Sequence, residues 1–139
     1  MEPRLNIITL GVKDLKISHH FYTEILAWKP HSSTNEGISF FKLNGLFLSL
    51  YQEEKLAEDV GVNPEGKGFK KFSLAYNTRS EKEVDDLIAS LKSKGVKIVK
   101  YPEKAFWGGY SSYFSDPDDN LWEVAFNPFL ELDENGNVV

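Results

Sequence analysis

Apolar and polar residues follow the same order twice along the chain. In the first half, residues 5–12 are rich in β-branched and aliphatic side chains, which predicts a strand. Apolar residues then recur at helical spacing over residues 14–26, with Asp14 placed to cap the start of that helix. Further short strands are predicted at residues 28–31, 38–43 and 46–51, the last two joined by an Asn44-Gly45 turn.

The second half repeats this order. Residues 69–77 predict a strand, and Ser80 with Glu83 forms the Ser-x-x-Glu pattern that opens a helix. An apolar stripe at i, i+3, i+4 and i+7 continues to a stop at Gly95. Strands are then predicted at residues 96–99, 110–115 and 121–126, with a turn at 116–120 before the last one.

The repeated order, βαβββ followed by βαβββ, indicates an internal duplication in an α+β fold. We expect a single domain over 1–139, composed of a module at 5–51, a polar linker at 52–67, a module at 68–128 and an acidic tail at 129–139. The tail could form a small hairpin, lie against a partner subunit or fray. Each curved sheet has one helix and one uncovered face, so paired modules would enclose a cavity.

Composition and charge narrow the possible partners. The chain has 139 residues, a net charge of −5 and no cysteine. A negative protein is a poor match for nucleic acid or for an anionic membrane surface. The absence of cysteine excludes disulfides and zinc-thiolate sites, and with no signal peptide in the sequence we expect a cytoplasmic protein.

Several short sequence motifs in this order resemble the vicinal oxygen chelate superfamily. This group includes glyoxalase I, extradiol dioxygenases, fosfomycin-resistance enzymes and bleomycin-binding proteins. The resemblance covers residues 5–128. It rests on the motifs at 10–15 (Leu-Gly-Val-Lys-Asp-Leu), 107–110 (Trp-Gly-Gly-Tyr), 116–118 (Asp-Pro-Asp) and 121–124 (Leu-Trp-Glu-Val). It implies two βαβββ modules forming a curved mixed sheet around a cavity.

The resemblance also implies a metal site that this chain does not reproduce. Enzymes of the group hold a divalent ion with His, a carboxylate, His and Glu on four strands. The corresponding positions here carry Ile7, Ser49 (or Tyr51 after a register slip), Phe72 and Glu123. A single carboxylate among four positions holds such an ion weakly. The histidines, His19, His20 and His31, are not spaced to replace the missing ligands, so we expect no metal and no cofactor.

Strand alternation sorts the remaining residues by face. If Ile7 and Phe72 face the cavity, Thr9, Leu74 and Tyr76 do so too, and Ser73 and Ala75 face a helix. The expected ligand-binding residues are Thr9, Phe47, Ser49, Tyr51, Phe72, Tyr76, Trp107, Tyr110 and Glu123. Their side chains could equally fill the cavity as core. Glu123 could bind a ligand, act as a general base or be structural, and the Trp107 loop could be a lid or a packed loop.

The function indicated is a metal-free protein that binds a small molecule, resembling the bleomycin-binding branch. The ligand would be cationic or aromatic. The alternative is an enzyme of the family, a lyase, isomerase or dioxygenase, that uses a non-standard metal site or Glu123 as base. A third interpretation is a protein-interaction module with a closed cavity. The resemblance also suggests a homodimer, in which chains can exchange modules, although a monomer suits the spacing equally well.

Overall fold

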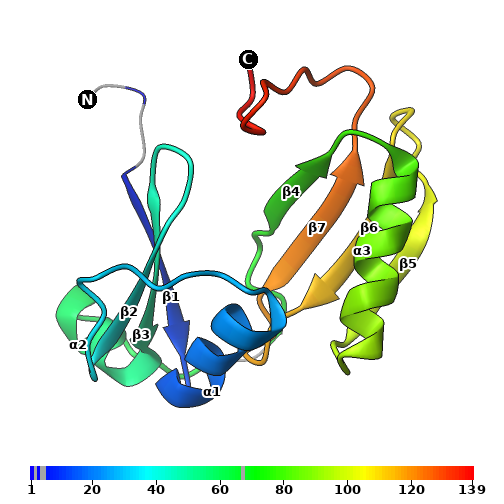
Figure 1. The fold of residues 1–139 in the computed structure, drawn as a ribbon. Coiled ribbons are helices and arrows are strands. Elements are labelled where there is room, and N and C mark those ends of the chain that lie inside the picture. The colour runs from blue at the N-terminus through cyan, green and yellow to red at the C-terminus, as the bar shows by residue number, and fades with distance from the viewer. Residues whose placement is uncertain (2, 4–5, 67) are drawn as a thin grey trace. The chain divides into compact units, whose positions relative to one another are not determined.

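The computed structural model describes residues 1, 3, 6–66 and 68–139, and shows an α+β chain of two compact units (Figure 1). The units are Met1–Gly68 and Phe69–Val139. Position 5, where the first predicted strand starts, and position 67, where the predicted linker ends, lie outside the described residues.

The first unit contains a three-stranded sheet. Its strands are β1 (Ile7–Val12), β2 (Ile38–Lys42) and β3 (Phe47–Gln52), in the order β1-β3-β2. Strand β1 runs parallel to β3, and β2 runs antiparallel to it. These three strands confirm the prediction. The strand predicted at 28–31 was wrong, because only one isolated bridge forms there, between Pro30 and Phe41.

The predicted helix at 14–26 is in two parts, α1 (Leu15–His20) and the π-helix η1 (Phe21–Ile25). The Asp14 carboxylate accepts hydrogen bonds from the amides of Lys16 and Ile17, as an N-cap does. The wider π-helical turn changes the angle between successive side chains, a change that apolar spacing alone does not reveal. The buried Tyr22 packs against Trp28 and Phe41 at ring-centroid distances of 5.5 and 5.6 Å.

The segment 52–67 holds a helix that the polar composition concealed. Helix α2 (Glu53–Val60) follows β3 directly and buries Ala57. It lies against β1 at Gly11, where a Cβ atom would come within 3.3 Å of the Glu53 Cβ. Glycine at this position therefore permits the close approach of helix and strand.

The second unit contains a four-stranded sheet and one helix. Its strands are β4 (Leu74–Thr78), β5 (Ile98–Lys104), β6 (Tyr110–Ser115) and β7 (Leu121–Phe126), in the order β4-β7-β6-β5. Strand β4 is parallel to β7 and the other pairs are antiparallel. These four strands confirm the predicted strands in type and in their order along the chain. Strand β4 begins five residues later than predicted, and β5 continues to Lys104, beyond the predicted end at residue 99.

Helix α3 (Glu81–Ser93) begins and ends where the sequence predicts. The Ser80 hydroxyl accepts a hydrogen bond from the Glu83 amide at 3.2 Å, while the Glu83 carboxylate accepts one from the Arg79 amide at 2.9 Å. Gly95 ends the helix with a φ of 79°. The apolar stripe is buried against the sheet at Val84, Ile88 and Leu91.

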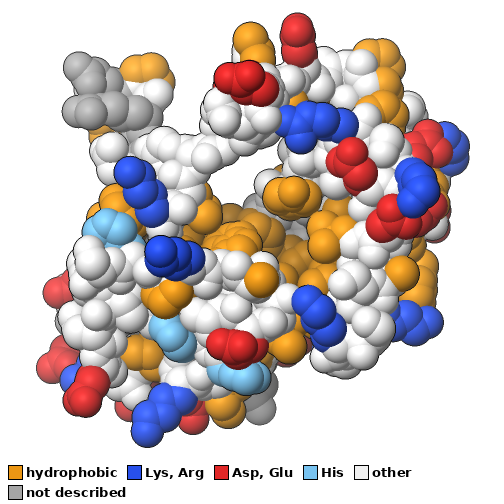
Figure 2. All heavy atoms as spheres, in the orientation of Figure 1, with side chains coloured by type: hydrophobic (Ala, Val, Ile, Leu, Met, Phe, Trp, Pro, Cys, Tyr) orange, Lys and Arg blue, Asp and Glu red, His pale blue; other side chains and the backbone are white. Residues whose placement is uncertain are grey.

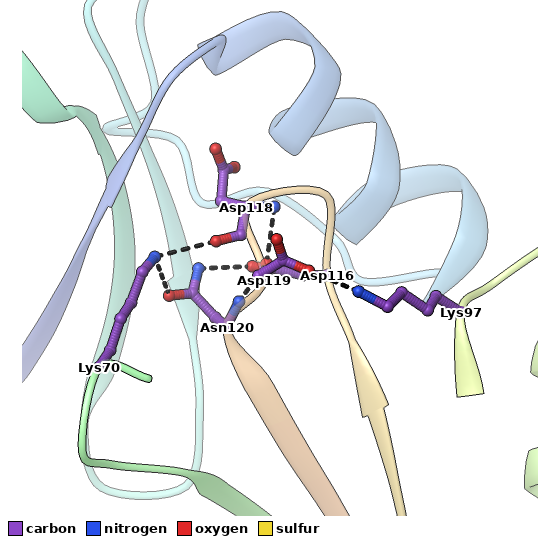
Figure 3. A network of polar contacts seen from close by, with 6 residues as sticks. All are labelled: Lys70, Lys97, Asp116, Asp118, Asp119 and Asn120. Atoms are coloured by element: carbon purple, nitrogen blue, oxygen red, sulfur yellow. Dashed lines mark hydrogen bonds and ion pairs between the residues drawn. The ribbon is translucent and has the colours of Figure 1, made fainter. Parts of the chain in front are cut away.

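A five-residue loop built around Asp116 joins β6 to β7. One Asp116 oxygen accepts from the amides of Asp118 and Asn120, both at 2.9 Å, and the other accepts from the Asn120 side-chain amide at 2.8 Å. Lysines hold the loop from outside, since Lys70 donates to Asn120 at 2.9 Å and Lys97 pairs with Asp119 at 3.0 Å (Figure 3). The predicted turn is confirmed.

The tail repeats this loop. Asp133 accepts from the amides of Asn135 and Asn137 at 2.9 and 2.8 Å, and from the Asn137 side chain at 2.8 Å. Gly136, with a φ of 81°, stands where Asp119 has a φ of 57° in the first loop. A bridge between Leu132 and Val138 closes the turn. Of the three possibilities for the tail, the structure shows the hairpin.

Charged side chains of both signs are spread over the molecular surface that Figure 2 draws. Lysines lie near carboxylates in several places, for example Lys82 with Asp86 at 2.5 Å and Lys100 with Glu103 at 2.8 Å. These pairs are exposed to solvent, so they contribute little to the stability of the fold.

Candidate functional site

One face of the first sheet packs on α1 and the other carries the predicted site residues. Leu10 and Val12 of β1 are buried at 3% and 0% exposure, whereas Ile7 is 53% exposed. The ladder aligns residues on this more open face across the three strands, in the rows Ile7-Phe47-Lys42, Thr9-Ser49-Phe40 and Gly11-Tyr51-Ile38. The predicted shared face of Ile7, Thr9, Phe47, Ser49 and Tyr51 is confirmed.

Two hydroxyl groups lie together in the middle row. Thr9 Oγ1 and Ser49 Oγ are 2.7 Å apart and hydrogen bonded. Ser49 is fully buried on the central strand, whereas Thr9 is exposed on the edge strand. Two hydroxyls carry two protons and one serves the mutual bond, so the pair has a second proton to donate. The face is therefore apolar and aromatic around one polar pair.

Glu123 lies on β7 in the second unit, between two strands. Its ladder partners are Ala75 on β4 and Tyr113 on β6. Burial raises the pKa of the Tyr113 phenol, and a side-chain hydrogen bond to Glu123 raises that pKa further. Among the residues that the structure describes, no lysine, arginine or histidine forms an ion pair with Glu123. The carboxylate therefore has capacity to accept a further donor.

The β4 register corrects the predicted faces in this unit. Ala75, not Tyr76, is the partner of Glu123, while Leu74 and Tyr76 pair with Trp122 and Val124 on the α3 side. The prediction that Leu74 and Tyr76 share a face with Glu123, and that Ala75 faces the helix, was therefore wrong. The prediction had counted alternation from Phe72, which lies before β4, and was therefore out of step with the ladder by one residue.

Phe72, the position matched to a metal-binding histidine, is not part of the ladder, so its predicted face stays a prediction. Phe72 lies two residues before β4 begins. Counting back by two from Ala75 leads to Ser73 and not to Phe72. Alternation extended by one residue beyond β4 would therefore give Ser73 as the next position on the Glu123 face.

The Tyr110 side chain reaches α3, and Trp107 lies in the loop before β6. The Tyr110 hydroxyl donates to Asp85 of α3 at 2.9 Å, and this hydrogen bond raises the pKa of Tyr110. The Trp107 indole packs over Gly109, where a Cβ atom would lie only 1.8 Å from the ring. Trp107 thus belongs to a packed loop in this conformation, as one of the two interpretations had it.

Polar residues of β6 are the part of this face that sequence reasoning missed. Ser111, Tyr113 and Ser115 pair with Ala125, Glu123 and Leu121. The buried Ser115 hydroxyl has no hydrogen-bond partner among the described residues. If Tyr113 in the predicted strand at 110–115 had been aligned with Glu123, alternation would have placed Ser111 and Ser115 on the same face.

The donors at the four matched strand positions do not fit a divalent metal ion. Ile7 offers no ligand atom, Ser49 is bonded to Thr9, and the β4 position offers Phe72 or Ser73. Glu123 is the one strong donor. Across residues 1, 3, 6–66 and 68–139, no three His, Asp or Glu side chains form a group that could hold a metal.

The histidines belong to local structure in the first unit. His19 Nδ1 is hydrogen bonded to the buried Ser39 at 2.8 Å, which joins α1 to β2. His31 Nδ1 bonds to Ser33 at 2.8 Å, and its ring lies edge-on to Phe47 at 5.0 Å. In the described part of the chain, no helix has the length and apolar character needed to cross a membrane.

Comparison with known proteins fixes the family. The model of the Glyoxalase/Bleomycin resistance protein/Dioxygenase superfamily matches residues 4–124. The chain belongs to this superfamily. Within it, the chain is 32% identical over 126 residues to "Fosfomycin resistance protein FosX" of Listeria monocytogenes, covering 86% of both chains. The predicted family is thus confirmed.

Solved structures of the superfamily share the fold. A glyoxalase-related enzyme from Fulvimarina pelagi is 35% identical with a TM-score of 0.89, covering 99% of this chain and 98% of that one. The crystal structure of FosX from Listeria monocytogenes is 27% identical with a TM-score of 0.70, covering 93% and 97% of the two chains. The superfamily fold that the sequence motifs predict is therefore confirmed.

Proposed function

We propose that this superfamily member binds a small organic molecule on the Glu123 face without a bound metal ion. The observation that carries the proposal is the Glu123–Tyr113 pair. A half-buried carboxylate with no cationic partner among the described residues favours a ligand that brings a donor or a positive charge.

The predicted residues of the first unit offer aromatic surface and a hydroxyl group on a face of their own. Phe47 and Tyr51 offer flat apolar surface, and Thr9 offers a hydroxyl proton. Pockets that bind small molecules combine an apolar lining with a few such polar groups. An aromatic ligand suits the face of the first unit, and a cationic amine suits the Glu123 face of the second.

Thermal unfolding with defined probes tests the proposal. Benzylamine and larger aromatic ammonium ions are titrated, with fosfomycin as the comparison because the relatives are named for it. A ligand that binds only the native state stabilises it and so raises the melting temperature. At a ligand concentration one hundred times Kd, the gain in unfolding free energy is about 2.7 kcal/mol. We expect an aromatic ammonium ion to do so, and we expect the effect to disappear in Glu123→Gln.

Glu58→Gln is the matched control, since Glu58 is exposed on α2. It removes one negative charge and should retain the shift. If Glu58→Gln reduces the shift as much as Glu123→Gln, net charge and not a Glu123 site explains binding. A shift with fosfomycin alone, and only with Mn²⁺ present, would contradict the proposal.

The alternative is an enzyme, because one relative, from Serratia marcescens, is named "Glutathione transferase FosA". Without a metal, Glu123 is the group that could act as a base. Opening of fosfomycin by water or by a thiol, followed by NMR, distinguishes the two functions. Turnover lost in Glu123→Gln but retained in Glu58→Gln would favour the enzyme.

We further propose that the chain acts in the cytoplasm as a homodimer. The dimer is what the superfamily resemblance implies. Light scattering after size-exclusion chromatography measures the mass directly. A mass of twice 15.8 kDa is expected, and a mass of 15.8 kDa would contradict it.

A further inference from the structure

The C-terminal strap, residues 127–139, is tied to the second unit at Arg79. This arginine directly follows β4. Its Nη2 donates to the carbonyl oxygens of Asp133 and Glu134 at 2.8 and 3.1 Å. The Arg79 guanidinium thus binds the carbonyl groups of two consecutive strap residues, which are more than fifty residues from Arg79 in the sequence.

The Asp133 loop presents those two carbonyls. The Asp133 carboxylate accepts from Asn135 and Asn137, and Gly136 donates to the Asp133 carbonyl at 3.0 Å. The hydrogen bonds from Asn137, and then that from Asn135 and the nearby charge of Arg79, lower the pKa of Asp133. The strap is therefore a preformed loop and not a loose chain end.

A second contact joins Phe129 of the strap to Gly108 in the loop between β5 and β6. The Phe129 ring lies over Gly108, where a Cβ atom would be 3.2 Å from the ring. Gly108 has a φ of 96°, a conformation that glycine adopts readily. Residues 105–109 form a tight turn, in which Gly108 donates to Ala105 at 3.0 Å and Ala105 donates to Gly109 at 2.9 Å.

We propose that the strap holds the 105–109 loop in place and that Arg79 fastens the strap. The loop leads directly into β6, which carries Ser111 and Tyr113 beside Glu123. Release at Arg79 frees Phe129, and the loop with Trp107 then opens more often. The strap thereby limits opening at one end of the ligand face. That last consequence rests on the proposed function, whereas the coupling of strap and loop does not.

Amide hydrogen exchange of the full chain, followed by NMR without ligand, tests the coupling. The strap reporters are the amides of Asn137 and Val139, and the loop reporters are those of Ala105 and Gly108. Arg79→Met removes the donors but keeps an apolar stem. We expect exchange to rise about five-fold or more at both sets of reporters. Unchanged exchange of the Ile88 and Leu91 amides shows that the variant is folded.

Lys82→Met is the control, because Lys82 pairs with Asp86 on α3 and does not contact the strap. It should leave both sets of reporters unchanged. Acceleration confined to the strap in Arg79→Met would overturn the proposal, as would no acceleration at all. Equal acceleration in Lys82→Met would also overturn it, because a general loss of stability would then explain the effect.

Phe129→Ala tests the second contact separately. It should accelerate the Ala105 and Gly108 amides while Asn137 stays protected by the Asp133 loop. Phe129→Leu, which keeps an apolar contact, should have a smaller effect on the loop. Unchanged loop exchange in Phe129→Ala would overturn the proposal. Since no ligand is present, these results are independent of whether the Glu123 site binds anything.

Discussion

Ala75 and Glu123 are direct partners in the parallel ladder of β4 and β7. The small side chain of Ala75 leaves space beside the carboxylate, and Tyr113 on the other side donates to it. Tyr76 lies on the opposite face with Val124. The polar centre of this sheet is therefore built from β4, β6 and β7. Glu123 has the Tyr113 phenol on one side and the open position beside Ala75 on the other.

The register predicts where a metal ligand can be introduced. Ser73→His should place an imidazole on the Glu123 face, whereas Phe72→His should not. With Zn²⁺ at ten times its Kd, Ser73→His should gain about 1.4 kcal/mol of stability, or about 3–6 °C in Tm. Thermal unfolding with and without Zn²⁺ measures this. A larger gain in Phe72→His would show that the register reasoning fails at this end of β4.

The Tyr113–Glu123 contact predicts a dependence of stability on alkaline pH. The folded pKa of Tyr113 is raised above its ordinary value of 10.0, first by burial and then by the hydrogen bond to Glu123. The stability that Tyr113 contributes is therefore complete below pH 10 and declines as pH rises through the folded pKa. Urea unfolding between pH 9 and pH 11.5 should show a steeper decline for the wild type than for Tyr113→Phe. Parallel curves for the two proteins would refute the prediction.

The Asp133 loop predicts a response to acid. Hydrogen bonds from Asn137 lower the pKa of Asp133 below its ordinary value of 3.8. Its contribution is therefore present above that value and is lost as pH falls through the lower, folded pKa. Exchange of the Asn137 amide, corrected for intrinsic rates, should stay slow to below pH 4 and then rise. In Asp133→Ala the amide should be poorly protected at every pH, and equal protection in both proteins would exclude this role.

Ala27 is an exposed non-glycine residue in a left-handed conformation, with a φ of 57°. It follows η1, where Trp28 donates to the Tyr22 carbonyl at 2.9 Å. A Cβ atom in this conformation costs roughly 1–2 kcal/mol, part of which glycine loses again through the greater entropy of its unfolded chain. Ala27→Gly should therefore stabilise the protein by about 0.5–1 kcal/mol in urea unfolding. The control is Ala89→Gly, on an exposed face of α3, which should destabilise it by about 1 kcal/mol.

Most strands, in their order along the chain, and the long helix α3 could be predicted because local sequence signals and tertiary structure agree at these elements. The Ser80 cap, the stripe at Val84, Ile88 and Leu91, and the Gly95 stop all indicate one helix. Helix α2 was missed because it buries little besides Ala57, so its sequence resembles a polar linker. The π-helical turn was missed because backbone hydrogen bonding, and not side-chain pattern, defines it.

Which residues share a face could be predicted on β1, β3 and β7 but not on β4. Alternation is reliable where one face of a strand is buried, as for Leu10 and Val12 on β1. Strand β4 lies at a sheet edge and exposes both Ala75 and Tyr76, so side-chain type does not reveal which face is inward. The ladder with β7 resolves this, and that pairing is a long-range contact that no local pattern contains.

The central claim is that the chain works without the metal ion typical of its enzymatic relatives. Untagged protein is purified, its metal content is measured, and nickel, iron, cobalt, manganese and zinc are then titrated while the melting temperature is followed. We expect less than about a tenth of an equivalent of bound metal and no shift with any ion. A stoichiometric metal together with a shift of several degrees, lost in Glu123→Gln, would contradict the claim and make the enzyme the leading function.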